Sequence, residues 1–273
     1  MPNVLDQFHL DVKTALITGG AGVLGTVFTR TLAEAGATVW IADIAPGRAE
    51  AAADALATEG LRARGIRVDV MERSSLEAAR EQVGQIDILI NSAGGNIKEA
   101  TTSDELSFFD LPREAFDKVV GLNLFGGAIL PAQVFGRAMA ERAAGGVILN
   151  VSSMNAFRPL TRIAGYSAAK AAVSNFTQWL AVHMAQEYNP RIRVNALAPG
   201  FFLTEQNRFL LTAAETGELT PRGETIIAHT PMGRFGDPGD LAGATLWLCS
   251  DAAAFVTGIV VPVDGGFSAF SGV

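Results

Sequence analysis

The 273-residue chain lacks most features that mark secreted, membrane-bound or nucleic-acid-binding proteins. Its one cysteine, Cys249, excludes a disulfide within the chain. Because the net charge is −7, we expect no nucleic-acid partner. There is no long apolar run and no apolar signal core near the start, so we expect no membrane partner and a cytoplasmic protein. The His, Cys and acidic residues lack metal-site spacing, so we expect no metal.

What the sequence does contain is an alternation of short apolar runs with alanine-rich segments. The apolar runs predict strands at 14–17, 38–41, 67–68, 87–90, 146–151, 192–195 and 259–261. The intervening segments predict helices at 24–35, 48–58, 74–83, 113–142, 165–188 and 238–249. Pro131 predicts a kink or break in the longest of these helices. Strands separated by helices indicate a parallel sheet covered on both faces.

Two architectures fit this alternation, an eight-stranded barrel and an open doubly wound sheet. The glycine-rich turn after the first expected strand favours the open sheet. We therefore predict an α/β protein, a single-domain doubly wound Rossmann fold with a mostly parallel seven-stranded sheet over residues 1–273. Residues 201–236 are rich in Thr, Glu, Arg, Gly and Pro and are too long for a plain connection, so we expect a substrate loop or lid there.

The glycine-rich turn, TGGAGVLG at 18–25, has the features of a dinucleotide site. Glycines let the backbone approach a pyrophosphate, and free amides at a helix N-terminus favour its negative charge. A flexible turn is the alternative. Asp43, eighteen residues beyond Gly25, can bind both hydroxyls of an adenosine ribose and would repel a 2′-phosphate. This favours NAD over NADP, although Asp43 could instead cap the next helix.

Tyr166 and Lys170 lie four positions apart in an expected helix and so share one face. A surface pair is the alternative, but the small neighbouring residues leave the backbone open to a cofactor. An ammonium about 5 Å from a phenol contributes roughly 3 kcal/mol at an effective dielectric of about 20. This corresponds to a fall of about two units in the phenol pKa. We therefore expect Tyr166 to exchange a proton with a substrate oxygen while a cofactor carries the hydride.

With these features the chain resembles the short-chain dehydrogenase/reductase family over nearly its whole length. The resemblance rests on motifs in a fixed order: TGGAGVLG at 18–25, NSAG at 91–94, Asn123, Ser152-Ser153, YSAAK at 166–170 and Pro199-Gly200. Any one of them could occur by chance, but the ordered set is specific. The chain departs from the family at Val23, where a glycine is usual.

The resemblance implies a catalytic group of four residues. Ser153 would hydrogen-bond the reacting carbonyl, and Tyr166 would be the general acid/base. Lys170 would hold the ribose of the nicotinamide and lower the pKa of the tyrosine. Asn123 would anchor a water molecule that relays protons from the lysine.

The resemblance also implies an NAD-binding set, in which Asp69 meets the adenine and residues 91–94 line the channel. The expected NAD-binding residues are Gly19, Gly22, Val23, Leu24, Gly25, Asp43, Asp69, Val70, Asn91, Ala93, Gly94, Tyr166, Lys170, Pro199, Gly200, Phe202 and Thr204.

Residues 153–160, 200–208, 228–236 and 263–268 are similar to the branch of this family that interconverts D-fructuronate and D-mannonate. A sugar acid needs a cation for its carboxylate and amides or hydroxyls for its alcohols. The expected substrate residues are Asn96, Ser153, Asn155, Arg158 and Arg208. Either arginine could instead bridge subunits or cap a loop.

Three functions stay open from the sequence: a mannonate-type sugar-acid dehydrogenase, a dehydrogenase of another polyol, sugar or hydroxy acid, and a catalytically silent NAD-sensing protein. The family resemblance implies a homotetramer, in which the apolar tail with Phe267 and Phe270 is buried. We expect His183 to pack within the fold or to face a neighbouring subunit. We expect His229 to make a hydrogen bond within its loop, with an approach to the substrate as the alternative.

Overall fold

The computed structural model describes residues 3–203, 208–213 and 217–272. In this part of the chain, seven strands form one sheet of order β3-β2-β1-β4-β5-β6-β7. Every pair of neighbouring strands is parallel. The strands are β1 (Thr14–Thr18), β2 (Thr38–Asp43), β3 (Ala63–Arg67), β4 (Ile88–Asn91), β5 (Gly146–Val151), β6 (Ile192–Pro199) and β7 (Val260–Val263). The predicted doubly wound sheet is therefore confirmed, and the barrel alternative is wrong.

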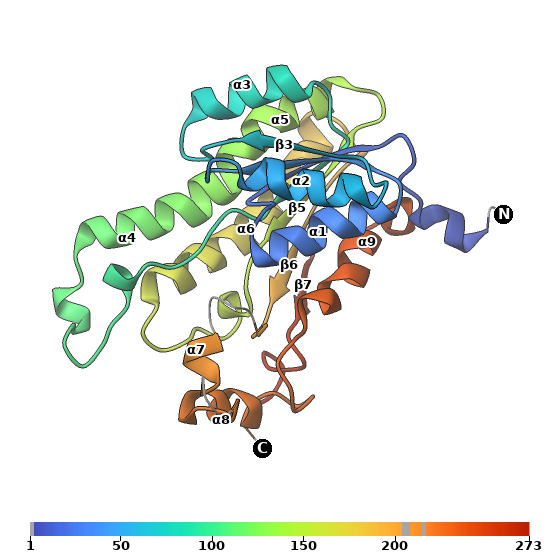
Figure 1. Ribbon diagram of the computed structural model, residues 1–273. Helices are drawn as coiled ribbons and strands as arrows, with labels where there is room; N and C mark the ends of the chain where they lie inside the picture. The colour runs from blue at the N-terminus through green and yellow to red at the C-terminus, as the bar shows by residue number, and fades with distance from the viewer. Residues whose placement is uncertain (1–2, 204–207, 214–216, 273) are drawn as a thin grey trace.

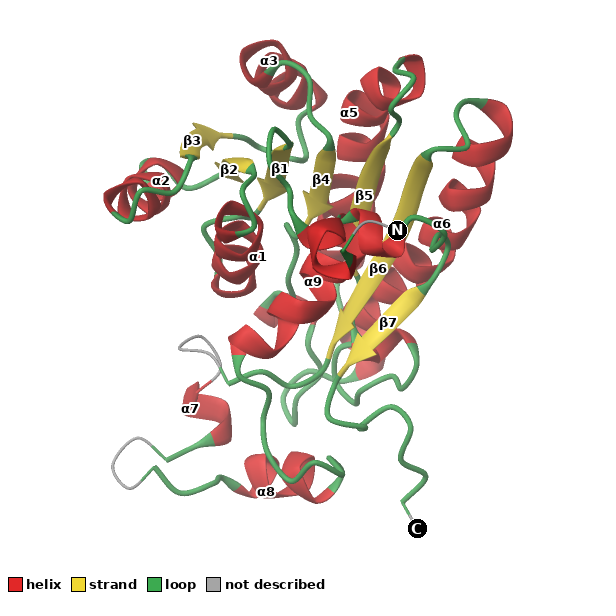
Figure 2. Cartoon of the chain, turned by 90° about the vertical axis from the view of Figure 1, so that its right-hand side faces the viewer, coloured by secondary structure: helices red, strands yellow, loops and turns green. Residues whose placement is uncertain are grey.

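Helices cover both faces of this sheet (Figure 2). The described α-helices are α1 (Val23–Glu34), α2 (Arg48–Thr58), α3 (Arg73–Val83), α4 (Arg113–Val120), α5 (Leu130–Glu141), α6 (Ala164–Glu187), α7 (Arg208–Leu211), α8 (Pro221–Ala228) and α9 (Ala242–Cys249). The described 3₁₀ helices are η1 (Val4–Phe8), η2 (Lys98–Ala100), η3 (Phe108–Asp110), η5 (Met154–Ala156), η6 (Pro238–Leu241) and η7 (Asp251–Ala253), and η4 (Gly121–Ile129) is a π-helix.

The two faces of the sheet form two separate cores, because successive side chains of a strand point in opposite directions. In β1, Leu16 packs on the side of α3, α5 and α6, in a cluster that includes Phe135. Its neighbour Ile17 packs on the side of α1 and α9, with Phe28 and Leu248. This two-sided burial explains why the strand sequences are apolar throughout rather than alternating.

The long helical region runs from 113 to 141 without a break. Its middle, η4, is a π-helix, in which the Leu130 amide reaches back to the Phe125 carbonyl. Pro131 has no amide hydrogen to donate and lies in the first turn of α5, where that loss is tolerated. The helical region is therefore not broken at Pro131, but its regular α-helical geometry is interrupted by the π-helix η4, which contains three glycines and lies just ahead of the proline. A kink stays a prediction.

By length and composition alone, this 113–141 stretch could cross a membrane, with a mean hydropathy of 1.5. Within the fold, 56% of its apolar window is buried, as expected for a core helix. It is the only such helix among the residues that the structure describes.

Some strand limits differ from the prediction because pairing, rather than side-chain pattern, sets them. β3 lies at Ala63–Arg67 instead of 67–68, since its backbone pairs with β2 although its sequence is polar. β6 extends to Pro199, well beyond the predicted 195, because β5 and β7 pair with it on both sides.

The strand order reverses between β1 and β4, which are hydrogen-bonded neighbours. The carboxyl ends of the strands point toward the end of the molecule where α7, α8 and the C-terminus lie (Figures 1 and 2). Ligands of open α/β sheets bind beyond the carboxyl ends, at such a reversal. The fold therefore directs attention to this end of the molecule.

Candidate active site

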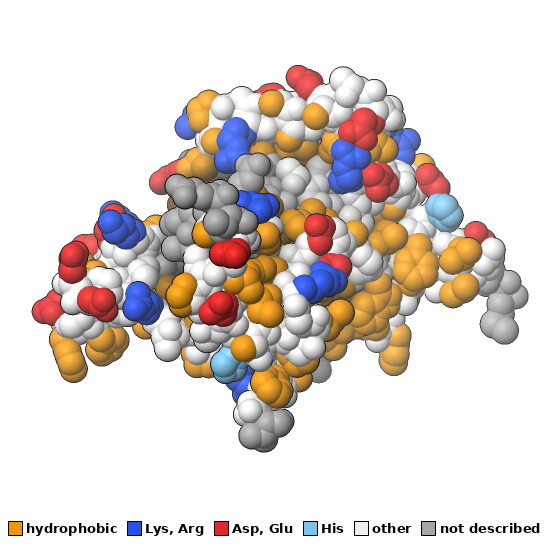
Figure 3. All heavy atoms as spheres, turned by 60° about the horizontal axis from the view of Figure 1, so that its bottom comes forward, with side chains coloured by type: hydrophobic (Ala, Val, Ile, Leu, Met, Phe, Trp, Pro, Cys, Tyr) orange, Lys and Arg blue, Asp and Glu red, His pale blue; other side chains and the backbone are white. Residues whose placement is uncertain are grey.

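A cleft of about 790 Å³ opens at the carboxyl ends of the strands. The residues that follow β1, β3, β4 and β6 and the last residues of β2 and β5 contribute to its wall, together with one face of α6. Figure 3 looks onto this end of the molecule, where hydrophobic side chains are interspersed with scattered charges of both signs.

The glycine turn closes one wall of the cleft, and α1 begins at Val23, directly after it. Gly19 has φ +64°, and a Cβ there would lie 2.9 Å from the Cα of Ala93. A Cβ on Gly25 would collide with the carbonyl oxygen of Gly19. Gly22, the N-cap of α1, also lines the cleft. The turn therefore brings bare backbone and a helix N-terminus to the cleft, as a bound pyrophosphate requires.

Asp43 ends β2 and lines the cleft while 8% exposed. One of its oxygens accepts a hydrogen bond of 3.0 Å from the Ala45 amide. The N-cap of α2 is Gly47, so Asp43 does not cap that helix. Nearby, the Arg48 guanidinium donates to the Ala21 carbonyl over 2.7 Å and ties α2 to the glycine turn. This leaves the Asp43 carboxylate at the cleft wall, where it can accept from ribose hydroxyls.

Asp69 and Val70 line the cleft beyond β3, and Ala93 and Gly94 line it beyond β4. One oxygen of Asp69 accepts from the Met71 amide over 2.9 Å, which fixes the turn that holds it. These four residues lie at the wall where the sequence places them.

Asn91 lies beneath this wall rather than in it, with an exposed fraction of 1%. Its side-chain amide donates to the Oδ1 of Asn150 over 2.9 Å. Asn150 in turn donates to the hydroxyl of Thr177 over 2.9 Å. This buried polar chain joins β4, β5 and α6, so in this structure Asn91 braces the site instead of lining it.

Tyr166 and Lys170 line the cleft from successive turns of α6, and Ser153, two residues beyond the end of β5, lines it as well. The Lys170 ammonium lies 5.6 Å from the centre of the Tyr166 ring and donates to the Val151 carbonyl over 2.7 Å. Ser153 shares a side-chain hydrogen bond with Tyr166. The fold thus brings a phenol, an ammonium and a hydroxyl to one place.

Burial perturbs both titrating groups. It raises the pKa of Tyr166, while the hydrogen bond with Ser153 acts in the opposite direction. It lowers the pKa of Lys170 to about 8. The expected lowering of the tyrosine pKa is therefore not found in this structure: burial of the phenol raises the pKa, and the cause that acts against burial is the hydrogen bond with Ser153 rather than the ammonium of Lys170. Helical spacing brings the two groups together but does not set how far they are desolvated.

Asn123 lies in the π-helix η4 and is fully buried. Its amide donates to the carbonyls of Gly95 (2.7 Å) and Val119 (2.8 Å) and accepts from the Gly95 amide (3.1 Å). A Cβ on Gly94 would lie 2.7 Å from the Oδ1 of Asn123 and 3.3 Å from the Nζ of Lys170. Asn123 therefore shapes the loop beside the lysine, and its expected water relay stays a prediction.

Two of the predicted substrate amides reach the cleft. Asn96 lines it and donates to the hydroxyl of Thr101 over 2.7 Å. Asn155 lines it as well, although its Oδ1 accepts from the Leu160 amide over 3.0 Å. The Asn155 backbone amide donates to the Ser153 hydroxyl over 3.2 Å, so Asn155 also orients the catalytic serine.

The two arginines predicted to bind the substrate do not line the cleft. Arg158 is exposed after η5 and Arg208 is exposed at the start of α7, and neither lines the cleft. Instead, the cleft is lined by Arg222, the second residue of α8, which the sequence analysis did not single out. A helix-start pattern within the expected lid, Thr220 as N-cap followed by Pro221, could have drawn attention to it.

The last predicted cofactor residues follow β6. Gly200 and Phe202 line the cleft, whereas Pro199 is buried at the end of the strand. A Cβ on Gly200 would lie 2.6 Å from the Cα of Asp264, so only glycine fits there. Thr204 lies outside the described residues.

The aromatic tail packs within its own chain. The ring of Phe267 lies 5.3 Å from that of Phe201, and Phe267 and Phe270 both lie 6.5 Å from the ring of His229. The Nδ1 of His229 is 2.8 Å from the Thr225 carbonyl, which agrees with the local hydrogen bond expected for it. Across the parts of the chain described, no cluster of three or more His, Cys, Asp or Glu residues could hold a metal ion.

With this geometry in place, comparisons with known proteins are informative. Residues 20–268 match a family described as Enoyl-(Acyl carrier protein) reductase. An "Uncharacterized oxidoreductase UxuB" from Bacillus subtilis is 47% identical over 97% of this chain and 98% of its own length.

Two solved structures are similar throughout. A crystal structure of "a putative D-Mannonate oxidoreductase" from Haemophilus influenzae, with bound NAD, matches at 42% identity and a TM-score of 0.90 over 99% of this chain and 100% of that one. A gluconate 5-dehydrogenase from Burkholderia cenocepacia, with NADP and tartrate, matches at 33% identity and a TM-score of 0.85 over 98% of this chain and 100% of that one.

Proposed function

The chain belongs to the short-chain dehydrogenase/reductase family, and on that premise we propose that it is an NAD-dependent oxidoreductase interconverting D-fructuronate and D-mannonate. It is an oxidoreductase acting on a CH–OH group and is related to sugar-acid dehydrogenases. The observation that carries the proposal is the meeting of Tyr166, Lys170 and Ser153 in a cleft whose opposite wall is the glycine turn.

The residues around the cleft suit NAD. Bare backbone at Gly19 and Gly25 leaves room for a pyrophosphate at the N-terminus of α1, and the Asp43 carboxylate suits an unphosphorylated ribose. The Haemophilus relative was solved with NAD, whereas the Burkholderia relative was solved with NADP. When bound, the nicotinamide supplies the hydride or accepts it.

Side chains of this protein would transfer the proton to and from the substrate oxygen. In reduction of a ketone, the Tyr166 hydroxyl donates its proton to the carbonyl oxygen, and in the reverse direction it takes that proton back. The Ser153 hydroxyl donates a hydrogen bond to the same oxygen. Lys170, with a pKa of about 8, is still largely protonated at neutral pH and stabilises negative charge that develops on the phenol.

The sugar-acid assignment has two supports. The Haemophilus and Burkholderia relatives carry the names of a mannonate and a gluconate enzyme. Amides at Asn96 and Asn155 and a guanidinium at Arg222 reach the cleft, which suits alcohols and a carboxylate. Phe201, Phe202 and Arg222, which line the cleft, come from residues 201–236, where a substrate loop or lid is expected, and that assignment stays a prediction.

A steady-state panel tests this function. The purified protein is assayed with NADH and NADPH against D-fructuronate, 5-keto-D-gluconate and neutral ketoses. We expect the highest kcat/KM for D-fructuronate with NADH. A preference for another keto acid or for a neutral ketose would reject the mannonate assignment but would leave the assignment as a dehydrogenase intact. NADH binding without any turnover would support the sensing alternative.

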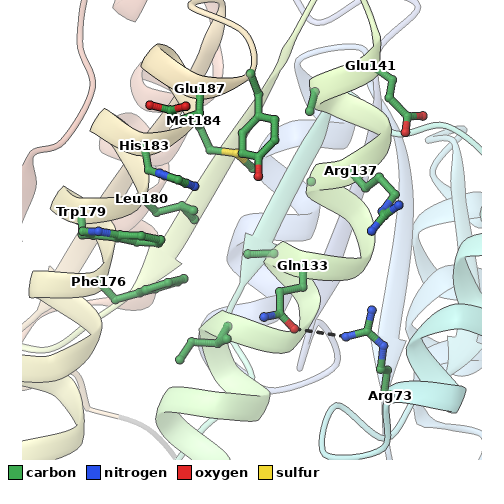
Figure 4. A pocket seen from close by; sticks show the side chains of 15 residues that line it. Arg73, Gln133, Arg137, Glu141, Phe176, Trp179, Leu180, His183, Met184 and Glu187 are labelled. Atoms are coloured by element: carbon green, nitrogen blue, oxygen red, sulfur yellow. Dashed lines mark hydrogen bonds between the residues drawn. The ribbon is translucent and has the colours of Figure 1, made fainter.

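We also propose that the protein is a homotetramer that uses the groove between α5 and α6 (Figure 4). The groove has a volume of about 720 Å³. On its α6 side, Phe176 and Trp179 stack at 6.1 Å between ring centres, and Trp179 stacks on His183 at 4.6 Å. Trp179 is 56% exposed, which is unusual for so large an apolar side chain.

The charges around the groove favour a second copy of the same chain as its occupant. Arg73 and Arg137 lie on one side of it and Glu141 and Glu187 at its end, so both signs are present. A surface of this kind is complementary to itself about a two-fold axis.

The cytoplasmic location stays a prediction.

A further inference from the structure

Arg222 is the cation of the cleft that has no assigned role. Of the described residues that line the cleft, two are cationic, Lys170 and Arg222. Lys170 is 5% exposed and its ammonium is engaged with the Val151 carbonyl. Among the residues that the structure describes, none is ion-paired or hydrogen-bonded to the Arg222 guanidinium. Arg222 is therefore a positive group open to an anion that enters the cleft.

The local structure holds Arg222 in place. The hydroxyl of Thr220, the N-cap of α8, accepts from the Gly223 amide over 3.1 Å. The Thr220 backbone amide donates to the Leu211 carbonyl over 3.0 Å. A Cβ on Gly223 would collide with that same carbonyl, so α8 packs directly on the backbone at Leu211. Leu211 is 2% exposed, and Arg222 is thus carried by a turn fixed on a buried residue.

Arg222 stands apart from the acidic residues of the cleft. Asp43 ends β2 and Asp69 follows β3, both at one edge of the sheet. Phe201 and Phe202, which line the cleft together with Arg222, follow β6 on the other side of the strand reversal. The acidic residues therefore lie where the ribose of the cofactor is expected, whereas Arg222 is carried by α8, which lies away from β2 and β3 (Figure 1).

We propose that Arg222 binds the carboxylate of the substrate and sets the preference for sugar acids over neutral sugars. This inference rests on the proposed function and adds the group that recognises the acid. A guanidinium presents paired N–H donors that match the two oxygens of a carboxylate, which a lysine ammonium does not. The pyrophosphate of the cofactor already has the glycine turn and the N-terminus of α1. The substrate carboxylate has no other free described cation in the cleft.

The test compares Arg222→Met and Arg222→Lys with Arg208→Met, which removes an exposed arginine of the neighbouring helix outside the cleft wall. For each, kcat/KM with NADH is measured for D-fructuronate and for D-fructose, its neutral counterpart. We expect Arg222→Met to lower the acid-to-neutral ratio about 10- to 100-fold, mainly through the KM for the acid. Arg222→Lys should lower the acid-to-neutral ratio by a smaller factor, and Arg208→Met should leave the ratio unchanged.

Calorimetric binding of D-mannonate to the protein saturated with NADH gives a second readout without turnover. We expect Arg222→Met to weaken this binding by a similar factor and Arg208→Met to leave it unchanged. Wild-type selectivity retained in Arg222→Met would overturn the inference, as would a loss seen only in NADH affinity. Failure of the wild type to reduce any keto sugar acid would instead reject the proposed function.

Discussion

The ammonium of Lys170 lies 5.6 Å from the centre of the Tyr166 ring, one turn further along α6. Both groups are desolvated, which raises the pKa of the tyrosine and lowers that of the lysine to about 8. Burial therefore shifts each group toward its neutral form relative to its state in water, although Lys170 with a pKa of about 8 is still largely protonated at neutral pH.

Replacement of Tyr166 by Phe removes the proton that the mechanism moves while keeping the ring. We expect kcat to fall about 10²- to 10⁴-fold, the usual contribution of a positioned general acid/base. NADH affinity, measured by fluorescence titration, should change little. Tyr188→Phe is the matched control for kcat, because Tyr188 is 60% exposed and lies outside the cleft, in the groove between α5 and α6. Turnover near that of the wild type in Tyr166→Phe would remove this residue from its assigned role.

The lowered pKa of Lys170 predicts a pH dependence of stability. Between the folded value of about 8 and the ordinary 10.5, the unfolded chain binds more protons, so the free energy of unfolding rises with pH. The slope from one such group is at most about 1.4 kcal/mol per pH unit. Tyr166, whose pKa is raised by burial, lowers the free energy of unfolding with rising pH only above its ordinary pKa of 10. The effect of Lys170 can therefore be measured separately between about pH 8 and 9.5.

Urea denaturation across that window checks the effect. The difference in unfolding free energy between wild type and Lys170→Met should grow with pH, whereas Lys118→Met, at an exposed position of α4, should show a constant difference. Parallel curves for wild type and Lys170→Met would mean that the lysine titrates normally in the folded protein.

Asp43→Asn tests the choice between the two nicotinamide cofactors. The amide keeps the size of the side chain but removes the charge that repels a 2′-phosphate. We expect the ratio of the NADPH Kd to the NADH Kd to fall about tenfold or more, which corresponds to loss of a partly buried charge repulsion of about 1.4 kcal/mol. Asp54→Asn, on the exposed side of α2, should leave the ratio unchanged. An unchanged ratio in Asp43→Asn would show that another group excludes NADPH.

Gly94→Ala tests the close approach at the lysine. The added methyl would lie 2.7 Å from the Oδ1 of Asn123 and 3.3 Å from the Nζ of Lys170, so both side chains must move. We expect kcat to fall about tenfold or more, since small misplacements of catalytic groups are costly. Gly243→Ala is the control, because a methyl group added at Gly243 in α9 would meet no atom within 4 Å. This variant should preserve kcat and stabilise the helix by about 0.5–1 kcal/mol. Equal kcat in both variants would contradict the tight packing at Gly94.

Trp179→Glu tests the groove as the contact between subunits. A charge at the centre of an apolar self-association surface is costly to bury. We expect light scattering after size exclusion to show a smaller assembly than the wild type. Phe109→Glu changes a side chain that is 93% exposed elsewhere and should leave the assembly intact. A monomeric wild type would reject the proposal. A dimeric wild type would be consistent with the groove as a subunit contact but would reject the tetramer.

The sequence by itself determined the features that depend on backbone period and local sterics. A helix puts residues four apart on one face, so Tyr166 and Lys170 had to lie together once α6 formed. The glycine turn had to expose backbone, because Gly19 adopts a positive φ and Gly25 has no room for a side chain. Strand and helix alternation similarly determined the parallel sheet and placed these segments at its carboxyl edge.

Only the tertiary structure decided which distant side chains share the cleft and how strongly burial perturbs them. It placed Arg222 in the wall instead of Arg158 or Arg208, because the position of α8 relative to the strand ends depends on the packing of the whole fold rather than on a local pattern. It also reversed the expected shift of the Tyr166 pKa, since desolvation depends on everything that surrounds the ring. Spacing along the chain records local geometry, whereas exclusion of water is a property of the whole packed fold.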